Sequence, residues 1–259
     1  FQNCVISVQQ ASAALPTYTG SPSLPVIEGH LAAIRAYSSA FIKDADSSLK
    51  FAEKALQLLP ESEDAIRSVV AFTQSASAIL RDDHQQALLF ALQAAQSGQR
   101  SNRHAAVAAL GTAASLLQNQ GQFQQAEEKF RTILSWTMRE DGSFSPLAAR
   151  GFSGLASLQL YCMDLSTARQ HAWQAVQLAQ RWGSLDSLLS AQTHLVKCLV
   201  AQGELEEAGK ILNRIVSDKS TAQLSPGLTE TIQETQVIYW LSTGDFQKAL
   251  QWAKNNLPN

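Results

Sequence analysis

The chain has 259 residues, of which 45% are hydrophobic and 16% charged, and its formal net charge is −2. This composition is typical of a soluble folded protein and excludes a largely disordered chain, which would carry more charge and fewer apolar residues. A pI of about 6.2 argues against direct binding to nucleic acid or to an anionic membrane, because both attract an excess of basic residues. The sequence has no signal peptide and no apolar run long enough to span a bilayer, so we expect a cytoplasmic protein with no membrane partner.

The three cysteines, Cys4, Cys162 and Cys198, are far apart and include no CxxC pair. We therefore expect them to be buried small apolar residues of a reducing compartment, and not disulfide partners or zinc ligands.

Residues 1–26 form the first predicted segment. "VQQASAALP" is typical of the end of a helix, and "TYTGSPSLP" is typical of a loop. Because the chain begins at Phe1 without an initiator methionine, we interpret this segment as the end of a repeat that is cut upstream, followed by a loop.

The rest of the chain, residues 27–257, repeats. A small residue recurs at nearly constant intervals along it, at Ser48, Ala87, Ala126, Ala168, Ala208 and Ala249. We call these six residues the anchors. A period near 40 with so little scatter indicates a helical repeat. The predicted units lie at about 27–60, 61–98, 101–138, 144–182, 184–217 and 225–257.

Each unit is predicted to hold an inner helix, a tight turn just before the anchor, and an outer helix. In the third unit, Leu110, Ala113 and Leu117 form an apolar stripe before the turn, and Phe130 and Ile133 continue one after it. The pairs Ser145-Pro146 and Ser225-Pro226 place a capping serine before a proline suited to the first helical turn. The predicted fold is all-α, a right-handed α-solenoid of about six TPR-like helix-turn-helix units.

Five phrases carry a resemblance to a known family. They are "EGHLAAIRAYSSA" (28–40), "AEKALQLLPESEDAIRSVVA" (52–71), "GQFQQAEEKFRTIL" (121–134), "PLAARGFSGLASLQLYCMDLSTARQHAWQAVQLAQRWG" (146–183) and "GDFQKALQWA" (244–253). With its period near 40, the sequence resembles the tetratricopeptide superfamily, and more closely the helical-repeat region of MalT-like regulators, the large ATP-binding relatives of the LuxR transcription factors.

The resemblance implies a bacterial sensor segment that receives a small-molecule inducer or a partner. In such regulators an ATP-binding module precedes the repeats and a helix-turn-helix DNA reader follows them, and both would be partners in the same longer chain. ATP is expected only in that upstream module, so no cofactor is expected in these residues. The phrase "GELEEAGKI" has too many residues between its glycines for a phosphate loop, and it lies within a predicted repeat.

In a solenoid of this type the inner helices line the concave side. At about 100° per residue, the positions 18, 15, 11 and 8 before each anchor face that side. From these rows and their neighbours we predict the ligand-binding residues Tyr37, Phe72, Gln118, Arg150, Ser153, Tyr161, Thr193, Lys197 and Glu234. A face with so few charges suits a neutral or weakly polar small molecule, with Arg150 or Lys197 holding a carboxylate or carbonyl.

Other interpretations fit the same residues. The three aromatic residues of the predicted site also fit packing between repeats, and Arg150 also fits a local ion pair. The alternative function is a protein–protein interaction scaffold whose groove holds a peptide or helix. His104 and His194 lie on separate units without a matching ligand set, so no metal site is expected. The sequence contains no recognisable nucleophile–base set and no carboxylate pair at a defined spacing, so we do not expect an enzyme.

Overall fold

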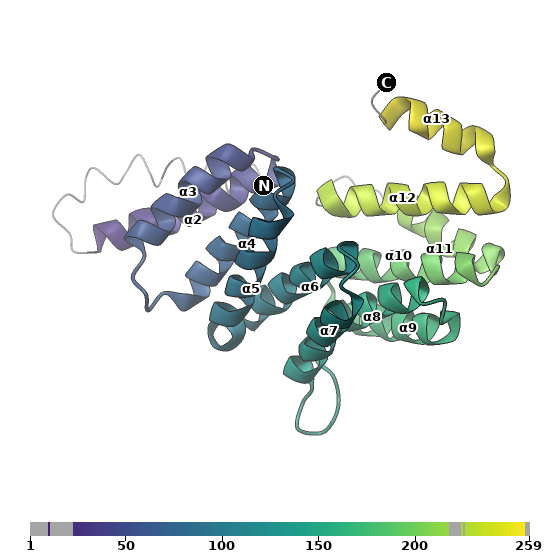
Figure 1. The fold of residues 1–259 in the computed structure, drawn as a ribbon, viewed down its shortest axis with the longest axis horizontal. Coiled ribbons are helices and arrows are strands. Elements are labelled where there is room, and N and C mark those ends of the chain that lie inside the picture. Colours follow the sequence, from purple (N-terminus) through teal and green to yellow (C-terminus); the bar gives the residue numbers. More distant parts are fainter. Residues whose placement is uncertain (1–9, 11–22, 218–223, 225, 257–259) are drawn as a thin grey trace. The chain divides into compact units, whose positions relative to one another are not determined.

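The computed structural model describes residue 10, residues 23–217, residue 224 and residues 226–256. Within these residues the chain forms α-helices, one short 3-10 turn and an isolated bridge between Met138 and Phe144, and it forms no strand (Figure 1). The helices are α2 (Leu24–Phe41), α3 (Ala45–Leu58), α4 (Asp64–Leu80), α5 (His84–Ser101), α6 (Arg103–Asn119), α7 (Phe123–Thr137), α8 (Ala149–Tyr161), α9 (Leu165–Trp182), α10 (Leu185–Ala201), α11 (Leu205–Ser217), α12 (Pro226–Thr243) and α13 (Phe246–Asn256). The predicted all-α repeat fold is confirmed.

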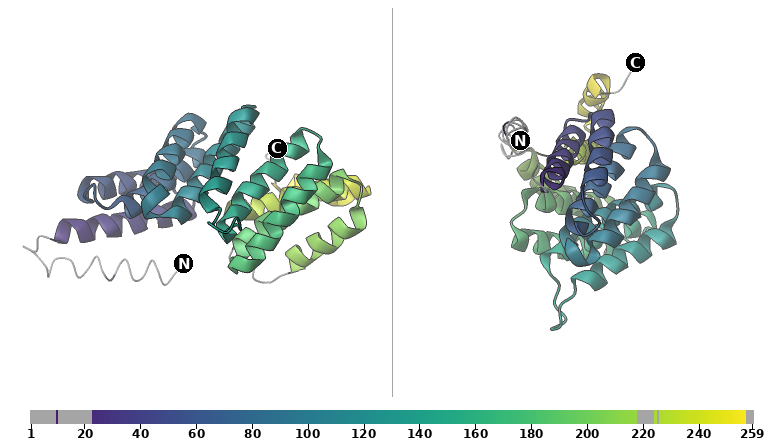
Figure 2. Two further views of the ribbon diagram at one scale, coloured as in Figure 1. Left: turned by 90° about the horizontal axis from the view of Figure 1, so that it is seen from below. Right: turned by 90° about the vertical axis from the view of Figure 1, so that its left-hand side faces the viewer.

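The chain divides into two compact units, residues 1–126 and residues 127–259, with the boundary inside α7. In unit 1, α2 packs against α3 and α4 against α5, and the inner helices α2, α4 and α6 are successive neighbours. In unit 2 the pairs are α8–α9, α10–α11 and α12–α13, and the inner helices are α8, α10 and α12 (Figures 1 and 2). Each unit therefore stacks helical hairpins, since a single hairpin cannot bury its apolar stripe.

The six anchors are buried in the structure. Ser48, Ala87, Ala126, Ala168 and Ala208 are 0% exposed, and Ala249 is 7% exposed. Ser48 also donates its hydroxyl to the carbonyl of Ala36 on α2 at 2.9 Å, which joins the two helices of the first hairpin. A small side chain at the anchor lets the helices of a hairpin approach closely, because a larger one would force them apart.

The turns between inner and outer helices share one backbone conformation. One residue in each turn, always at the same position before the anchor, has a positive φ: 63° at Lys43, 60° at Asp82, 76° at Gly121, 59° at Met163, 79° at Gly203 and 82° at Gly244. In the third hairpin, Gly121 N donates to Gln118 O at 3.0 Å and Gln122 N donates to Leu117 O at 2.9 Å. This pair of bonds is a Schellman motif, which satisfies the last carbonyls of the inner helix and explains why glycine is favoured there.

In three hairpins the aspartate that follows the turn caps the outer helix with its side chain. Asp44, Asp83 and Asp164 each accept a hydrogen bond from a backbone N–H in the first turn of that helix, at 3.1, 3.0 and 3.2 Å. For Asp44 and Asp164, hydrogen bonding to the side chain and then to the backbone N–H of Ser47 and Thr167 lowers the pKa of the carboxyl below its usual value.

Other local predictions need correction or fall outside the described residues. Ser145 does not cap α8: Pro146 begins the 3-10 turn Pro146–Ala148, and Ser145 makes no side-chain cap bond. Cys162 is exposed because it ends the helix α8 at the turn, whereas Cys198 is buried as expected. The predictions for Ser225, for Cys4 and for most of residues 1–26 lie outside the described residues. No helix in the described part of the chain is long and apolar enough to cross a membrane.

Candidate functional site

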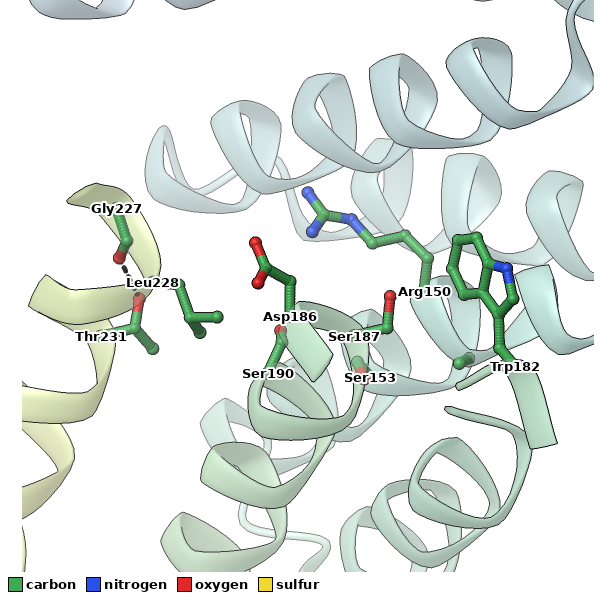
Figure 3. Close-up of a pocket in the computed structure, with 10 residues that line it drawn as sticks. Arg150, Ser153, Trp182, Asp186, Ser187, Ser190, Gly227, Leu228 and Thr231 are labelled. Carbon is green, nitrogen blue, oxygen red and sulfur yellow. Dashed lines mark hydrogen bonds between the residues drawn. The ribbon is translucent and has the colours of Figure 1, made fainter. Parts of the chain in front are cut away.

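A hollow of about 320 Å³ lies in unit 2, where the first turns of three inner helices meet the end of α9 (Figure 3). It is lined by Ala149, Arg150, Ser153, Trp182, Asp186, Ser187, Ser190, Gly227, Leu228 and Thr231. These residues come from α8, α9, α10 and α12, so three successive hairpins contribute to it. Its volume falls at the lower end of the range for small-molecule sites.

The repeat itself places these side chains together. Arg150, Ser190 and Thr231 hold the same position relative to the anchors of their units, on α8, α10 and α12 in turn. Ser187 and Leu228 lie one helical turn earlier on the same face of α10 and α12. Because the inner helices are neighbours in unit 2, equivalent positions of successive hairpins lie next to one another.

Arg150 supplies the positive charge of the hollow. It is exposed, and its guanidinium has no ion pair or hydrogen bond with any described residue. Desolvation by the surrounding protein lowers the pKa of Arg150, but a guanidinium keeps its proton far above neutral pH, so the side chain stays charged. Figure 3 shows its side chain extending into the space beside Asp186.

Hydroxyl groups surround this charge. The hydroxyls of Ser153, Ser187 and Ser190 make no hydrogen bond to any residue that the structure describes, and can donate to a ligand. The hydroxyl of Thr231 is occupied, because it donates to Gly227 O within α12 at 2.9 Å. The arrangement offers one strong charged donor and three weaker neutral donors in one hollow.

A neutral histidine lies next to the hollow on α10. His194 Nδ1 donates to Ser190 O at 2.8 Å. Desolvation, opposed by the hydrogen bond to Ser190 and helped by the positive charges of Lys197 and Arg150, lowers the pKa of His194 to about 4. His194 is therefore uncharged at neutral pH and adds no second positive charge beside Arg150.

The structure brings only two of the predicted site residues into this hollow, Arg150 and Ser153. Lys197 lies elsewhere on α10 and forms an ion pair with Glu234 of α12, with 3.9 Å between Nζ and Oε2. Thr193 is 0% exposed, and its hydroxyl donates to Ser190 O at 2.7 Å within the same helix. The side chain of Thr193 therefore faces neighbouring helices and not solvent, although the predicted row placed it on the concave face.

The remaining predicted residues are placed differently. Tyr37, Phe72 and Gln118 belong to unit 1, on α2, α4 and α6. Tyr37 is 53% exposed, Phe72 is partly buried and Gln118 is 9% exposed. Tyr161, at the end of α8 in unit 2, is 65% exposed and does not line the hollow. Ligand binding by these residues stays a prediction.

The sequence-based prediction missed most of the residues that line the hollow. The predicted rows begin at the position of Arg150 and its equivalents, and they leave out Ala149, Trp182, Asp186, Ser187, Gly227 and Leu228. Extending each row by one helical turn toward the start of the inner helix reaches all of these residues except Ala149 and Trp182.

Unit 1 contains a hollow of similar volume, about 340 Å³, on α3, α4 and α5. Its arginine, Arg81, approaches Asp46 at 3.9 Å, and Asp83 caps α5. Arg81 and Asp83 therefore have partners within the protein, whereas Arg150 has none among the described residues. The hollow of unit 2 is therefore the stronger candidate for binding a ligand.

The profile of the MalT-like TPR region matches residues 29–259. The chain belongs to this family. The MalT-like TPR region is similar in fold to BtubC (BKLC) from P. vanneervenii, with 17% identity and a TM-score of 0.61 over 83% of this chain and 87% of that one. It is also similar to the apo form of the quorum sensor NprR from B. thuringiensis, with 15% identity and a TM-score of 0.63 over 92% of this chain and 66% of that one.

At 15–17% identity, the similarity to these solved structures is evidence for a shared fold and for nothing beyond it. Among curated protein sequences, none matches this MalT-like TPR region. Family and fold together make it a TPR-like helical-repeat domain.

Proposed function

We propose that this MalT-like TPR region is the effector-sensing domain of a LuxR-family transcriptional regulator, and that the hollow of unit 2 binds its small-molecule inducer. The observation that carries the proposal is Arg150, an arginine without a partner among the described residues in a hollow of about 320 Å³. A guanidinium in this setting binds a ligand carboxylate or carbonyl through charge-assisted hydrogen bonds. Ser153, Ser187 and Ser190 supply further donors that orient the ligand.

Signalling follows from which helices the ligand would touch. The hollow draws its residues from α8, α10 and α12, so a bound ligand contacts three successive hairpins. A ligand that binds one arrangement of these hairpins more tightly than another shifts the population toward it. The shift would be passed to an ATP-binding module before the repeats and a DNA-binding module after them. Differential affinity is required, because equal binding to both arrangements moves no equilibrium.

The first test is a thermal-shift screen of the 259-residue chain against sugars, lactones, carboxylates and other metabolites, followed by calorimetry on each hit. A ligand of the folded state raises the melting temperature with concentration. We expect Arg150→Gln to weaken binding of a carboxylate or carbonyl ligand by about 10- to 100-fold, the range of a hydrogen bond to a charged group. Arg214→Gln, which removes an exposed arginine of α11 outside the hollow, is the matched control.

Two results would contradict the proposal. The first is a screen in which no small molecule shifts the melting temperature. The second is a ligand whose affinity falls equally in Arg150→Gln and Arg214→Gln, since that would place it outside the hollow.

The second candidate function is a scaffold that binds a peptide or helix. It is favoured by apolar side chains that are exposed on or beside the predicted rows, including Tyr37 (53%), Ile79 (39%) and Leu241 (51%). Such residues are enriched where proteins bind partners. Screening a displayed peptide library for binding to the chain tests this function. Peptides whose binding is lost in the Tyr37→Ser variant but retained in the Arg150→Gln variant would favour the scaffold over the sensor.

A further inference from the structure

The hollow of unit 2 contains a negative charge as well as a positive one. Asp186 lies in the first turn of α10 and lines the hollow. Its carboxylate has no hydrogen bond or ion pair with any residue that the structure describes, and the guanidinium of Arg150 has none either. The two charged groups share one small space without forming an ion pair with each other.

The two charges come from different helices and point into the same space. Arg150 extends from α8 and Asp186 from α10, and Figure 3 shows Asp186 between Arg150 and Leu228. A ligand with only a carboxylate would gain from Arg150 but would be repelled by Asp186. A ligand with a carboxylate and a cationic group on opposite sides would gain from both, so the pair selects for charge arrangement as well as for charge.

The other lining residues limit the size and shape of such a ligand. A volume of about 320 Å³ is too small for a long peptide and is at the lower limit for drug-sized molecules. Trp182 and Leu228 add apolar surface for a side chain, and an indole is also the best aromatic surface for a cation. The hydroxyls of Ser187 and Ser190 lie on the same helix as Asp186 and can orient an ammonium or a carbonyl.

The geometry points to a small zwitterion as the ligand of this hollow: a free amino acid or a dipeptide, with its carboxylate on Arg150 and its ammonium group on Asp186. This inference rests on the proposed function and specifies the chemical class of the inducer. The apolar side chain of the ligand would lie against Trp182 or Leu228. An acidic residue in a first helical turn is also favoured by the helix dipole, so the test must separate that local effect from ligand binding.

The test is calorimetric titration of the 259-residue chain with the standard amino acids and a set of apolar dipeptides. The best binder is then compared with its N-acetyl derivative, which removes the positive charge, and with its C-terminal amide, which removes the negative charge. We expect each derivative to bind at least about tenfold more weakly than the zwitterion, as loss of one charge-assisted hydrogen bond predicts. Asp186→Asn should abolish the preference over the N-acetyl derivative, and Arg150→Gln should abolish the preference over the amide.

Asp64→Asn is the matched control, because Asp64 also lies in the first turn of a helix, α4, but does not line this hollow. It should leave both preferences unchanged, and circular dichroism should show native helicity in all three variants. The dipeptide set separates the two members of the class: tighter binding of dipeptides than of amino acids would assign the ligand to short peptides.

The inference is overturned if the N-acetyl derivative binds as tightly as the zwitterion, or if Asp186→Asn keeps the preference. It is also overturned, with the sensor function intact, if amino acids and dipeptides fail to bind while another carboxylate binds through Arg150. If no small molecule binds, the sensor function fails and the inference fails with it.

Discussion

The contact between α7 and α8 in unit 2 gives a direct test of the packing. Gly154 lies inside α8 and faces Phe130 of α7, whose side chain is 2% exposed. A Cβ placed on Gly154 would lie 2.0 Å from Cε1, 2.2 Å from Cδ1 and 2.4 Å from Cζ of the Phe130 ring. Carbon atoms in contact are normally about 3.5–4.0 Å apart, so the ring would have to move by roughly 1.5 Å. We therefore predict that Gly154→Ala destabilises the protein.

Two effects set the magnitude. Alanine is favoured over glycine in a helix interior by about 1 kcal/mol, which opposes the prediction. Overpacking of a buried contact costs about 1–3 kcal/mol, and an overlap this large, against a buried ring, belongs at the upper end. The expected net loss in the free energy of unfolding is about 1–2 kcal/mol, which corresponds to a fall in melting temperature of about 2–8 °C for a protein of this size.

The assay is urea unfolding followed by circular dichroism, with calorimetry for the melting temperature. Gly227→Ala is the matched control, because a Cβ on Gly227 in α12 would meet no atom within 4 Å. That variant should be neutral or more stable by up to about 1 kcal/mol. In a double-mutant cycle, Phe130→Leu should reduce the cost of Gly154→Ala, since it removes the ring. A stable Gly154→Ala variant, or additive effects in the cycle, would refute the described packing of α7 on α8.

Three further predictions concern the turns, the buried histidine and the anchors. Gly121→Ala should lower the free energy of unfolding by about 1 kcal/mol, because φ is 76° at Gly121. Met163→Gly should be neutral or slightly stabilising, because Met163 has a φ of 59° and glycine adopts this conformation without strain. Urea unfolding of both variants checks this prediction, and equal effects would mean that the turn conformation is not the cause. Because the pKa of His194 is about 4 in the folded state against an ordinary value of 6.5, the unfolded state binds more protons between these values. His194 thus makes stability fall as the pH is lowered from about 6.5 to 4, by an amount on the order of 3 kcal/mol, and adds no pH dependence above that range. His194→Gln should remove this slope in unfolding curves measured at several pH values, and an identical slope in the variant would refute the assignment. Ala126→Leu should cost about 1–3 kcal/mol by overpacking at a residue that is 0% exposed, and an unchanged melting temperature would contradict the repeat register.

Much of the fold could be predicted because the signals are local. The anchors recur at a near-constant period, and a buried small residue is required wherever two helices cross closely. The turns are equally local: a residue with positive φ ends each inner helix, and glycine provides it at Gly121, Gly203 and Gly244. Lys43, Asp82 and Met163 adopt the same conformation without glycine, so the period identified those turns when composition did not.

The candidate site could be predicted only in part. The rows counted from the anchors reached Arg150 and Ser153, and these do line the hollow of unit 2. They also included Thr193, which is buried, and Lys197, which forms an ion pair with Glu234. A count at a fixed angle per residue gives the direction of a side chain but not the neighbour that covers it.

The helical repeat, its period, its anchors and its turns follow from the amino-acid order alone, because each depends on hydrogen bonds and contacts between residues close in the chain. Which inner-helix residues meet depends instead on how the hairpins pack. Arg150 and Asp186 belong to successive hairpins and share a hollow because α8 and α10 are neighbours in unit 2. That hollow exists where the first turns of successive hairpins leave space between them, and the amount of space is set by helix packing, which no local pattern in the sequence specifies.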